Sequence, residues 1–130
     1  MGITVLLDTH TLLWWLTDDP NLSPRARELI KDSSTTVLVS SASAWEIATK
    51  HRIGKLPGGE AVAPNLSELL RLERMGTLPI DLEHALLAGR LEHPHRDPFD
   101  RMLAAQAILE NIPVVSRDGV LSELGAARLW

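Results

Sequence analysis

The sequence predicts an α/β fold with a mostly parallel sheet, formed as one domain by residues 1–130. Short apolar, β-branched segments alternate along the chain with longer segments whose apolar residues recur at helical spacing. The length of 130 residues is typical of one domain. We find no internal repeat, low-complexity tract or linker composition that would divide the chain.

The first half of the chain starts with a strand, because Ile3–Leu7 is apolar and rich in β-branched residues. Ser23 and Pro24 predict the start of a helix, as its N-cap and first helical residue. Three glycines and two prolines within residues 54–64 predict a loop. The expected elements are a strand at 3–7, helices at 9–16 and 24–32, a strand at 35–39 and a helix at 45–52.

The second half repeats the alternation. Apolar residues at 66, 69, 70, 72 and 75 predict a helix that Gly76 ends. Pro79 confines the next strand to a sheet edge, because proline cannot donate a backbone hydrogen bond. The expected elements are helices at 65–75, 81–91 and 98–110, strands at 78–80, 114–116 and 126–129, and a loop at 117–125 with at most one helical turn.

Composition excludes several classes of protein. The chain has no cysteine, which rules out disulfides and thiolate metal sites and fits a cytoplasmic location. No apolar run approaches the roughly 18 residues of a membrane-spanning helix, and no basic segment of a signal peptide precedes the first strand. The net charge of −4 argues against a protein that coats nucleic acid non-specifically.

Acidic residues fall at or near the ends of the expected strands, where open α/β sheets bind their ligands. Their apolar neighbours draw these carboxylates toward the core, where like charges repel one another. A divalent cation such as Mg²⁺ or Mn²⁺ would relieve that repulsion, and pairs of such ions assist attack on phosphate. The candidates are Asp8, Glu46, Asp100 and Asp118, with Asp97 able to share a face with Asp100.

Each of these acids also has an ordinary structural interpretation. An aspartate after a strand, or at the start of a helix, is often an N-cap. Glu46 can pair with Lys50, four residues later on the same helix. Spacing alone does not show that the acids converge, so both interpretations stay open.

Four segments of the chain resemble the PIN domain of VapC-type toxins. They are LLDTHTLLW at 6–14, SASAWEI at 41–47, DPFDRMLAAQA at 97–107 and VVSRD at 114–118. The resemblance covers essentially the whole chain. It implies a three-layer α/β/α sandwich with a mostly parallel central sheet, and divalent-metal-dependent cleavage of RNA that leaves a 5′-phosphate and a 3′-hydroxyl.

The resemblance also assigns expected roles by position. Asp8, Glu46, Asp100 and Asp118 are the expected catalytic acids and ligands of Mg²⁺ or Mn²⁺. It further implies a homodimer and an antitoxin protein as partner. The role of His10 stays open, because the family often has asparagine there. The remaining expected site residues are Asp97 as an auxiliary or second-metal ligand, and Thr9 and Ser116 as hydroxyls near the metal.

Basic and aromatic residues complete the expected site. The expected RNA phosphate contacts are Lys50, Arg52, Arg96, Arg101 and Arg117, with surface solvation or helix ion pairing as the alternative. Neighbouring Trp14 and Trp15 cannot share one narrow helix face, so one is a candidate for an interface unless a wide core holds both. We expect Trp45 in the core, and His93 and His95 exposed in a loop.

Other functions stay possible on the sequence alone. A catalytically inactive PIN-like binding module and a metal-dependent DNA nuclease would each carry the same acids. A histidine-based ribonuclease would cleave without metal. A receiver-type signalling domain is disfavoured, because none of the three lysines, Lys31, Lys50 and Lys55, follows a late strand.

Overall fold

The computed structural model describes residues 2–130 and contains a five-stranded sheet in which every neighbouring pair is parallel. The sheet order is β3-β2-β1-β4-β5, so the first strand of the chain lies at the centre. The strands are β1 (Thr4–Leu7), β2 (Thr36–Ser40), β3 (Gly76–Leu78), β4 (Val114–Val115) and β5 (Arg128–Leu129). The expected α/β fold is confirmed, with a sheet that is parallel throughout.

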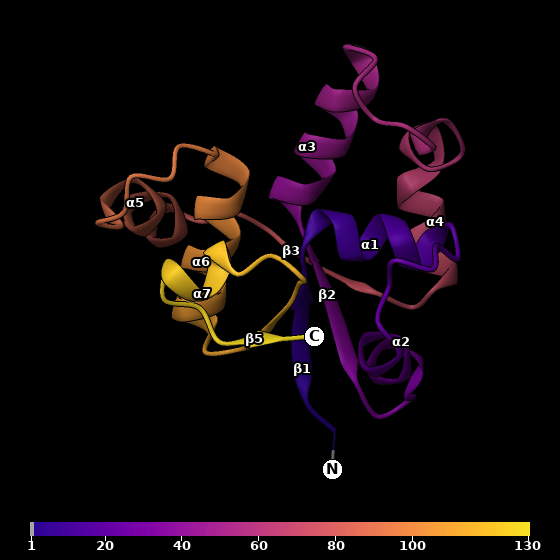
Figure 1. Ribbon diagram of the computed structural model, residues 1–130, viewed down its shortest axis with the longest axis horizontal. Helices are drawn as coiled ribbons and strands as arrows, with labels where there is room; N and C mark the ends of the chain where they lie inside the picture. The colour runs from indigo at the N-terminus through magenta and orange to yellow at the C-terminus, as the bar shows by residue number, and fades with distance from the viewer. Residues whose placement is uncertain (1) are drawn as a thin grey trace.

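Helices cover both faces of this sheet. Figure 1 shows α1, α2 and α4 on one side of the strands and α5, α6 and α7 on the other, which gives three layers. The helices are α1 (Thr9–Leu16), α2 (Pro24–Lys31), α3 (Ser41–Arg52), α4 (Leu66–Leu72), α5 (Leu82–Arg90), α6 (Pro98–Glu110) and α7 (Val120–Glu123), with 3₁₀ turns at Gly59–Ala61 and Ala63–Asn65. Within residues 2–130, none of these helices has the length and apolar character that crossing a membrane requires.

The alternation of side chains along β1 creates one apolar core on each face of the sheet. Val5 and Leu7 belong to the core that contains residues of α1 and α2, whereas Leu6 belongs to the core beneath α6 and α7. All three side chains are fully buried. Burial of β1 on both faces explains why its sequence is continuously apolar rather than alternating.

The register of the central strands sets the level at which they end. Leu7 lies opposite Val39 on one side and Val115 on the other. The residues that follow β1 and β4 therefore emerge side by side at the carboxyl edge of the sheet, which is where parallel sheets bind ligands.

Several element boundaries differ from the expected ones, and the differences at β3, at the end of α4 and at the start of α3 have a physical reason. β3 spans Gly76–Leu78, not 78–80, because Gly76 pairs with Leu38 in the sheet instead of ending the preceding helix. The positive φ of 58° that reverses the chain occurs at Arg74, just after α4. α3 begins four residues before the expected start at 45, because the Ser40 hydroxyl caps it by accepting a hydrogen bond from the Ala42 N–H at 2.9 Å.

Candidate active site

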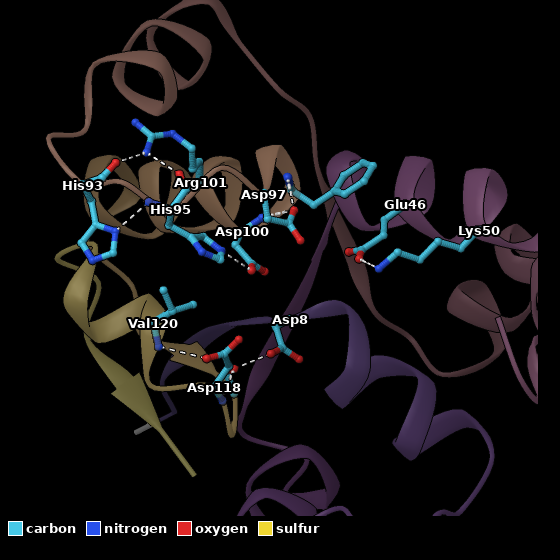
Figure 2. A network of polar contacts seen from close by, with 12 residues as sticks. Asp8, Glu46, Lys50, His93, His95, Asp97, Asp100, Arg101, Asp118 and Val120 are labelled. Atoms are coloured by element: carbon cyan, nitrogen blue, oxygen red, sulfur yellow. Dashed lines mark hydrogen bonds and ion pairs between the residues drawn. The ribbon is translucent and has the colours of Figure 1, made fainter. Parts of the chain in front are cut away.

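Acidic side chains from separate segments of the chain meet above the carboxyl edge of the sheet. Figure 2 shows Asp8, Glu46, Asp97, Asp100 and Asp118 pointing toward a common space. The first of these follows β1, Glu46 lies in α3, and Asp118 follows β4. Asp97 and Asp100 lie at the start of α6. The structure thus brings together the five acids that were singled out from the sequence.

Asp8 is both a helix cap and a member of this acidic group. Its Oδ1 accepts a hydrogen bond from the Thr11 N–H at 2.7 Å, which caps α1. Its Oδ2 accepts a hydrogen bond from the Ser116 hydroxyl. The side chain is buried, with 7% of its residue surface exposed. The capping interpretation is therefore observed, and the cap orients the carboxylate within the acidic group, where metal binding by Asp8 stays a prediction.

Ser116 connects two of the acids. Its fully buried hydroxyl donates to Asp8 and accepts a hydrogen bond from the Asp118 N–H at 3.0 Å. Asp118 itself is exposed, and its Oδ1 accepts from the Val120 N–H at 3.0 Å. The expected position of the Ser116 hydroxyl among the acids is what the structure shows, while its part in metal binding stays a prediction.

The start of α6 holds two carboxylates and a histidine. Asp97 caps the helix, since its Oδ1 accepts from the N–H groups of Phe99 at 2.9 Å and Asp100 at 3.3 Å. The Nε2 of His95 lies 2.8 Å from Oδ2 of Asp100. One ligand atom from each of His95, Asp97 and Asp100 lies within 4.8 Å of the other two, a spacing compatible with a metal ion.

The surroundings of Asp100 shift the pKa of its carboxyl. Burial is the largest influence and raises the pKa of its carboxyl. The hydrogen bond from His95 lowers the pKa, while the negative charges of Asp97 and Asp118 raise it further. The net pKa lies above the ordinary value, so the site disfavours a further negative charge until a cation neutralises it.

His95 is a candidate site residue that the sequence did not indicate. It was expected to be exposed in a loop, yet its side chain is only 29% exposed and contacts Asp100. The loop that brings it there is anchored by Arg101. His95 lies five positions before Asp100 and outside α6, so no periodic spacing signals their contact.

Arg101 has a role different from the expected contact with RNA. Its guanidinium donates to the carbonyl oxygens of Ala88 at 2.9 Å, Leu91 at 2.5 Å, and His93 and His95 at 2.9 Å each. These bonds use the donors that a phosphate would need. Arg101 therefore holds the segment between α5 and α6 against α6.

Glu46 lies in a buried position and is paired with a cation. Its carboxylate contacts the ammonium of Lys50, with side-chain exposures of 6% and 32% respectively. The ion-pair interpretation is therefore observed, and Figure 2 shows the Glu46 carboxylate turned toward the other acids. A contact between Lys50 and RNA stays a prediction.

The remaining expected site residues occupy varied positions. The Thr9 hydroxyl donates to the Ser43 hydroxyl at 3.0 Å and so joins α1 to α3, rather than bonding to one of the acids. Arg52 and Arg96 are exposed, at the end of α3 and just before α6. Their exposure leaves the predicted phosphate contacts open to test.

Trp45 is not in the core, contrary to expectation. It is 59% exposed, and its ring packs edge-on against Phe99 with ring centroids 4.9 Å apart. Its neighbour Glu46 turns inward, and successive residues on a helix point about 100° apart. The inward position of Glu46 therefore places Trp45 outside. Both Trp14 and Trp15 are half-buried.

Two cavities adjoin the acidic group. One, of about 370 Å³, is lined by Asp8, His10, Trp14, Arg117, Asp118 and Gly119. The other, of about 590 Å³, includes Glu46, Lys50 and Lys55 in its lining. His10 and Trp14 line both cavities, so the acids face a surface that also carries aromatic and basic groups.

The donor set of this site fits a hard divalent cation. All five acids offer carboxylate oxygen, the ligand that Mg²⁺ and Mn²⁺ prefer. Burial is the main cause of the raised pKa of Asp100, and the negative charges of Asp97 and Asp118 add to it. Bound positive charge would relieve the repulsion between these charges, which is the behaviour expected of a cation site.

A second cluster, Asp81, His84 and Glu110, lies outside this site and has a structural explanation. The buried His84 accepts a hydrogen bond from the Asp81 N–H at its Nδ1 and approaches Glu110 with Nε2 at 3.0 Å. The Asp81 side chain in turn accepts from the His84 N–H, which completes a capping box for α5.

Known proteins share sequence features and the fold with this chain. A family model described as PIN domain matches residues 5–127. Ribonuclease VapC16 of Mycobacterium tuberculosis (strain ATCC 25618 / H37Rv) is 42% identical over 64 residues. That match spans 49% of this chain and 44% of VapC16, less than half of the relative's length.

Solved structures share the fold at low sequence identity. VapBC2 from Rickettsia felis, bound to a promoter DNA fragment, has a TM-score of 0.71 at 17% identity and covers 98% of both chains. FitAcB from Neisseria gonorrhoeae has a TM-score of 0.67 at 18% identity, over 97% of this chain and 96% of the other. VapC20 of Mycobacterium tuberculosis, a sarcin–ricin loop cleaving toxin, has a TM-score of 0.62 at 17% identity, over 95% and 96%.

Proposed function

This chain belongs to the PIN-domain family, and we propose that it is a divalent-metal-dependent endoribonuclease that acts as the toxin of a toxin–antitoxin pair. The observation that carries the proposal is that acids after β1, in α3, at the start of α6 and after β4 face a common space. The identity to a relative named as a ribonuclease supports RNA as the substrate. We propose residues 1–130 as a single catalytic domain that acts in the cytoplasm.

In this proposal Asp8, Glu46, Asp100 and Asp118 hold Mg²⁺ or Mn²⁺, with Asp97 as an auxiliary ligand. A cation held by these groups supplies Lewis-acid chemistry, which polarises the phosphate and promotes ionisation of the attacking water. The expected products carry a 5′-phosphate and a 3′-hydroxyl.

The other residues of the site act by orienting these groups. The Ser116 hydroxyl donates a hydrogen bond to the Asp8 carboxylate, and the same hydroxyl oxygen accepts one from the backbone N–H of Asp118. Lys50 balances the charge of Glu46. The exposed Arg52, Arg96 and Arg117 are the proposed contacts to RNA phosphates, where they increase affinity without reading sequence.

Antitoxin binding and homodimer formation are part of the same proposal. Exposed apolar side chains support protein interfaces, among them Trp45 at 59%, Ile80 at 37% and Leu86 at 44% exposure. Trp45 and Ile80 line an apolar pocket of about 200 Å³ together with Phe99.

Cleavage assays on RNA and DNA of one sequence test the proposed activity. We expect Mg²⁺ or Mn²⁺ to support cleavage of the single-stranded RNA, EDTA to stop it, and the matched DNA to stay intact. Asp8→Asn and Asp100→Asn should reduce cleavage below detection while leaving the circular dichroism spectrum unchanged. Glu83→Gln, a change at an exposed acid of α5, is the matched control and should cleave normally.

Each alternative function has its own result in this experiment. Cleavage of the DNA in preference to the RNA would indicate a DNA nuclease. Cleavage that persists in EDTA would indicate histidine-based chemistry. A folded protein that binds Mn²⁺ but cleaves neither substrate would indicate an inactive binding module, and any of these three results would overturn the proposal.

A further inference from the structure

The cavity beside Asp8 and Asp118 combines acids with planar side chains. His10, Trp14 and Arg117 line it together with the two carboxylates, and its volume of about 370 Å³ lies within the range of small-ligand sites. His10 and Arg117 are exposed, whereas Trp14 is half-buried. The planar groups thus continue directly from the acidic group toward solvent.

The planar groups are held against one another. The Cζ atom of Arg117 lies 4.6 Å from the centroid of the Trp14 ring, a cation–π contact. The His10 ring centroid lies 5.7 Å from that of Trp14, and the Trp130 centroid lies 5.9 Å from it on another segment. Arg117 also approaches Oδ1 of Asn21 at 3.4 Å, which limits where its guanidinium can move.

The charges in the cavity indicate which part of an RNA chain would enter it. In the proposed function the phosphate lies at the cation that Asp8 and Asp118 hold, so the uncharged nucleobase is the part of the nucleotide that is left to enter the cavity. Aromatic rings and guanidinium planes are the groups on which proteins stack unpaired bases. The site therefore suits a base whose own phosphate lies at the neighbouring acidic group.

We propose that this cavity is a nucleobase subsite, which receives the unpaired base of the nucleotide next to the phosphate that is cut. The inference rests on the proposed function and adds a binding site for the base beside the phosphate that is cut. Bases within a duplex are stacked and paired, so they cannot enter such a cavity without being extruded.

Packing alone accounts for only part of this arrangement. Trp14 packs against the core of α1 and α2, which explains its buried edge. His10 and Arg117 are exposed, and burial of apolar surface gives no reason for their positions around the indole. A base-binding role accounts for the position of His10 beside the indole, while the cation–π contact holds Arg117 at the same cavity, where its guanidinium is the proposed phosphate contact.

Two probes that differ by one base test the subsite. Adenosine 5′-monophosphate and ribose 5-phosphate carry the same phosphate, and only the first carries a base. In calorimetric titrations with saturating Mn²⁺, we expect adenosine 5′-monophosphate to bind about tenfold or more tightly, the effect of stacking one base. It should also quench tryptophan fluorescence, and this quenching should decrease in Trp14→Phe.

The variant His10→Ala separates stacking from charge. It should weaken binding of adenosine 5′-monophosphate by about fivefold or more and leave ribose 5-phosphate unaffected. His51→Ala, at the end of α3 and outside the cavity lining, is the matched control and should bind both probes normally. Because His10 is exposed, loss of the fold does not confound this variant.

The outcomes distinguish the subsite from the proposed function. Equal Mn²⁺-dependent binding of both probes, lost in Asp100→Asn, would refute the subsite and leave the metal site standing. If the affinity for adenosine 5′-monophosphate were the same with and without Mn²⁺, and the same in Asp100→Asn, the proposed function would be contradicted. Equal cleavage rates for a single-stranded RNA and its duplex with the complement would also refute the subsite.

Discussion

The substitution Ser116→Ala tests how the acidic group is held together. It removes a fully buried hydroxyl that donates to the Asp8 carboxylate and accepts from the Asp118 N–H at 3.0 Å. A hydrogen bond to a charged group contributes about 1.5–3 kcal/mol to stability. The exposed position of Asp118 lets water replace the partner of its N–H, so we count only the bond to Asp8. The expected loss in the free energy of unfolding is therefore about 2 kcal/mol.

This loss is large enough to measure. For a chain of 130 residues, an unfolding entropy of about 2.1 cal/mol/K per residue converts 2 kcal/mol into a decrease in Tm of about 7 °C. Groups that orient metal ligands typically contribute about 10- to 100-fold to metal affinity, so Mn²⁺ should bind more weakly by a factor in that range. Urea denaturation in EDTA and calorimetric titration with Mn²⁺ measure the two effects separately.

The control is Ser67→Ala, which removes an exposed hydroxyl on α4. It should change the free energy of unfolding by less than about 0.5 kcal/mol and leave Mn²⁺ affinity unchanged. If Ser116→Ala matched this control in both measurements, the hydroxyl would not orient Asp8, and our account of the link between Asp8 and Asp118 would be wrong.

Three further predictions concern α6 and its surroundings. Because the pKa of Asp100 is raised in the folded state, its contribution to stability is present below the ordinary pKa of 3.8 and lost as pH rises through the raised value. Metal-free Asp100→Asn should therefore be more stable than the parent at pH 7, with a difference that vanishes toward pH 3 in urea titrations; a difference independent of pH would contradict this. Arg101→Met should lower the free energy of unfolding by about 2–3 kcal/mol through lost carbonyl contacts, whereas Arg90→Met, an exposed control, should have little effect. Trp45→Ser should cost less than about 1.5 kcal/mol, since the ring is 59% exposed and contacts Phe99; a loss of about 3–5 kcal/mol would indicate a core tryptophan.

The sequence predicted the fold well because its signals were local. β1 is continuously apolar as a strand buried on both faces must be, and Ser23-Pro24 marks the start of α2 where the structure has it. The start of α3 and the position of β3 were missed. A run of small residues suits a loop or a helix equally, and Gly76 suits a helix end as well as a close strand contact with Leu38.

The candidate site was predictable in its acids and not in their supporting contacts. Acids after apolar strands and at helix starts can be found from position alone. The contact between His95 and Asp100 could not be found in this way, because it depends on the path of the segment that Arg101 anchors. The exposure of Trp45 depends likewise on the helical phase, which became known only once Glu46 was seen to face inward.

The matched register of Leu7, Val39 and Val115 makes the acidic group unusually sensitive to changes in strand length. Deleting one residue from β1 would exchange the side chains assigned to the two cores and would also move Asp8 away from Ser116. Folding and catalysis would then fail together, so we expect insertions and deletions to accumulate in peripheral segments such as the loop before α4 rather than in the central strands.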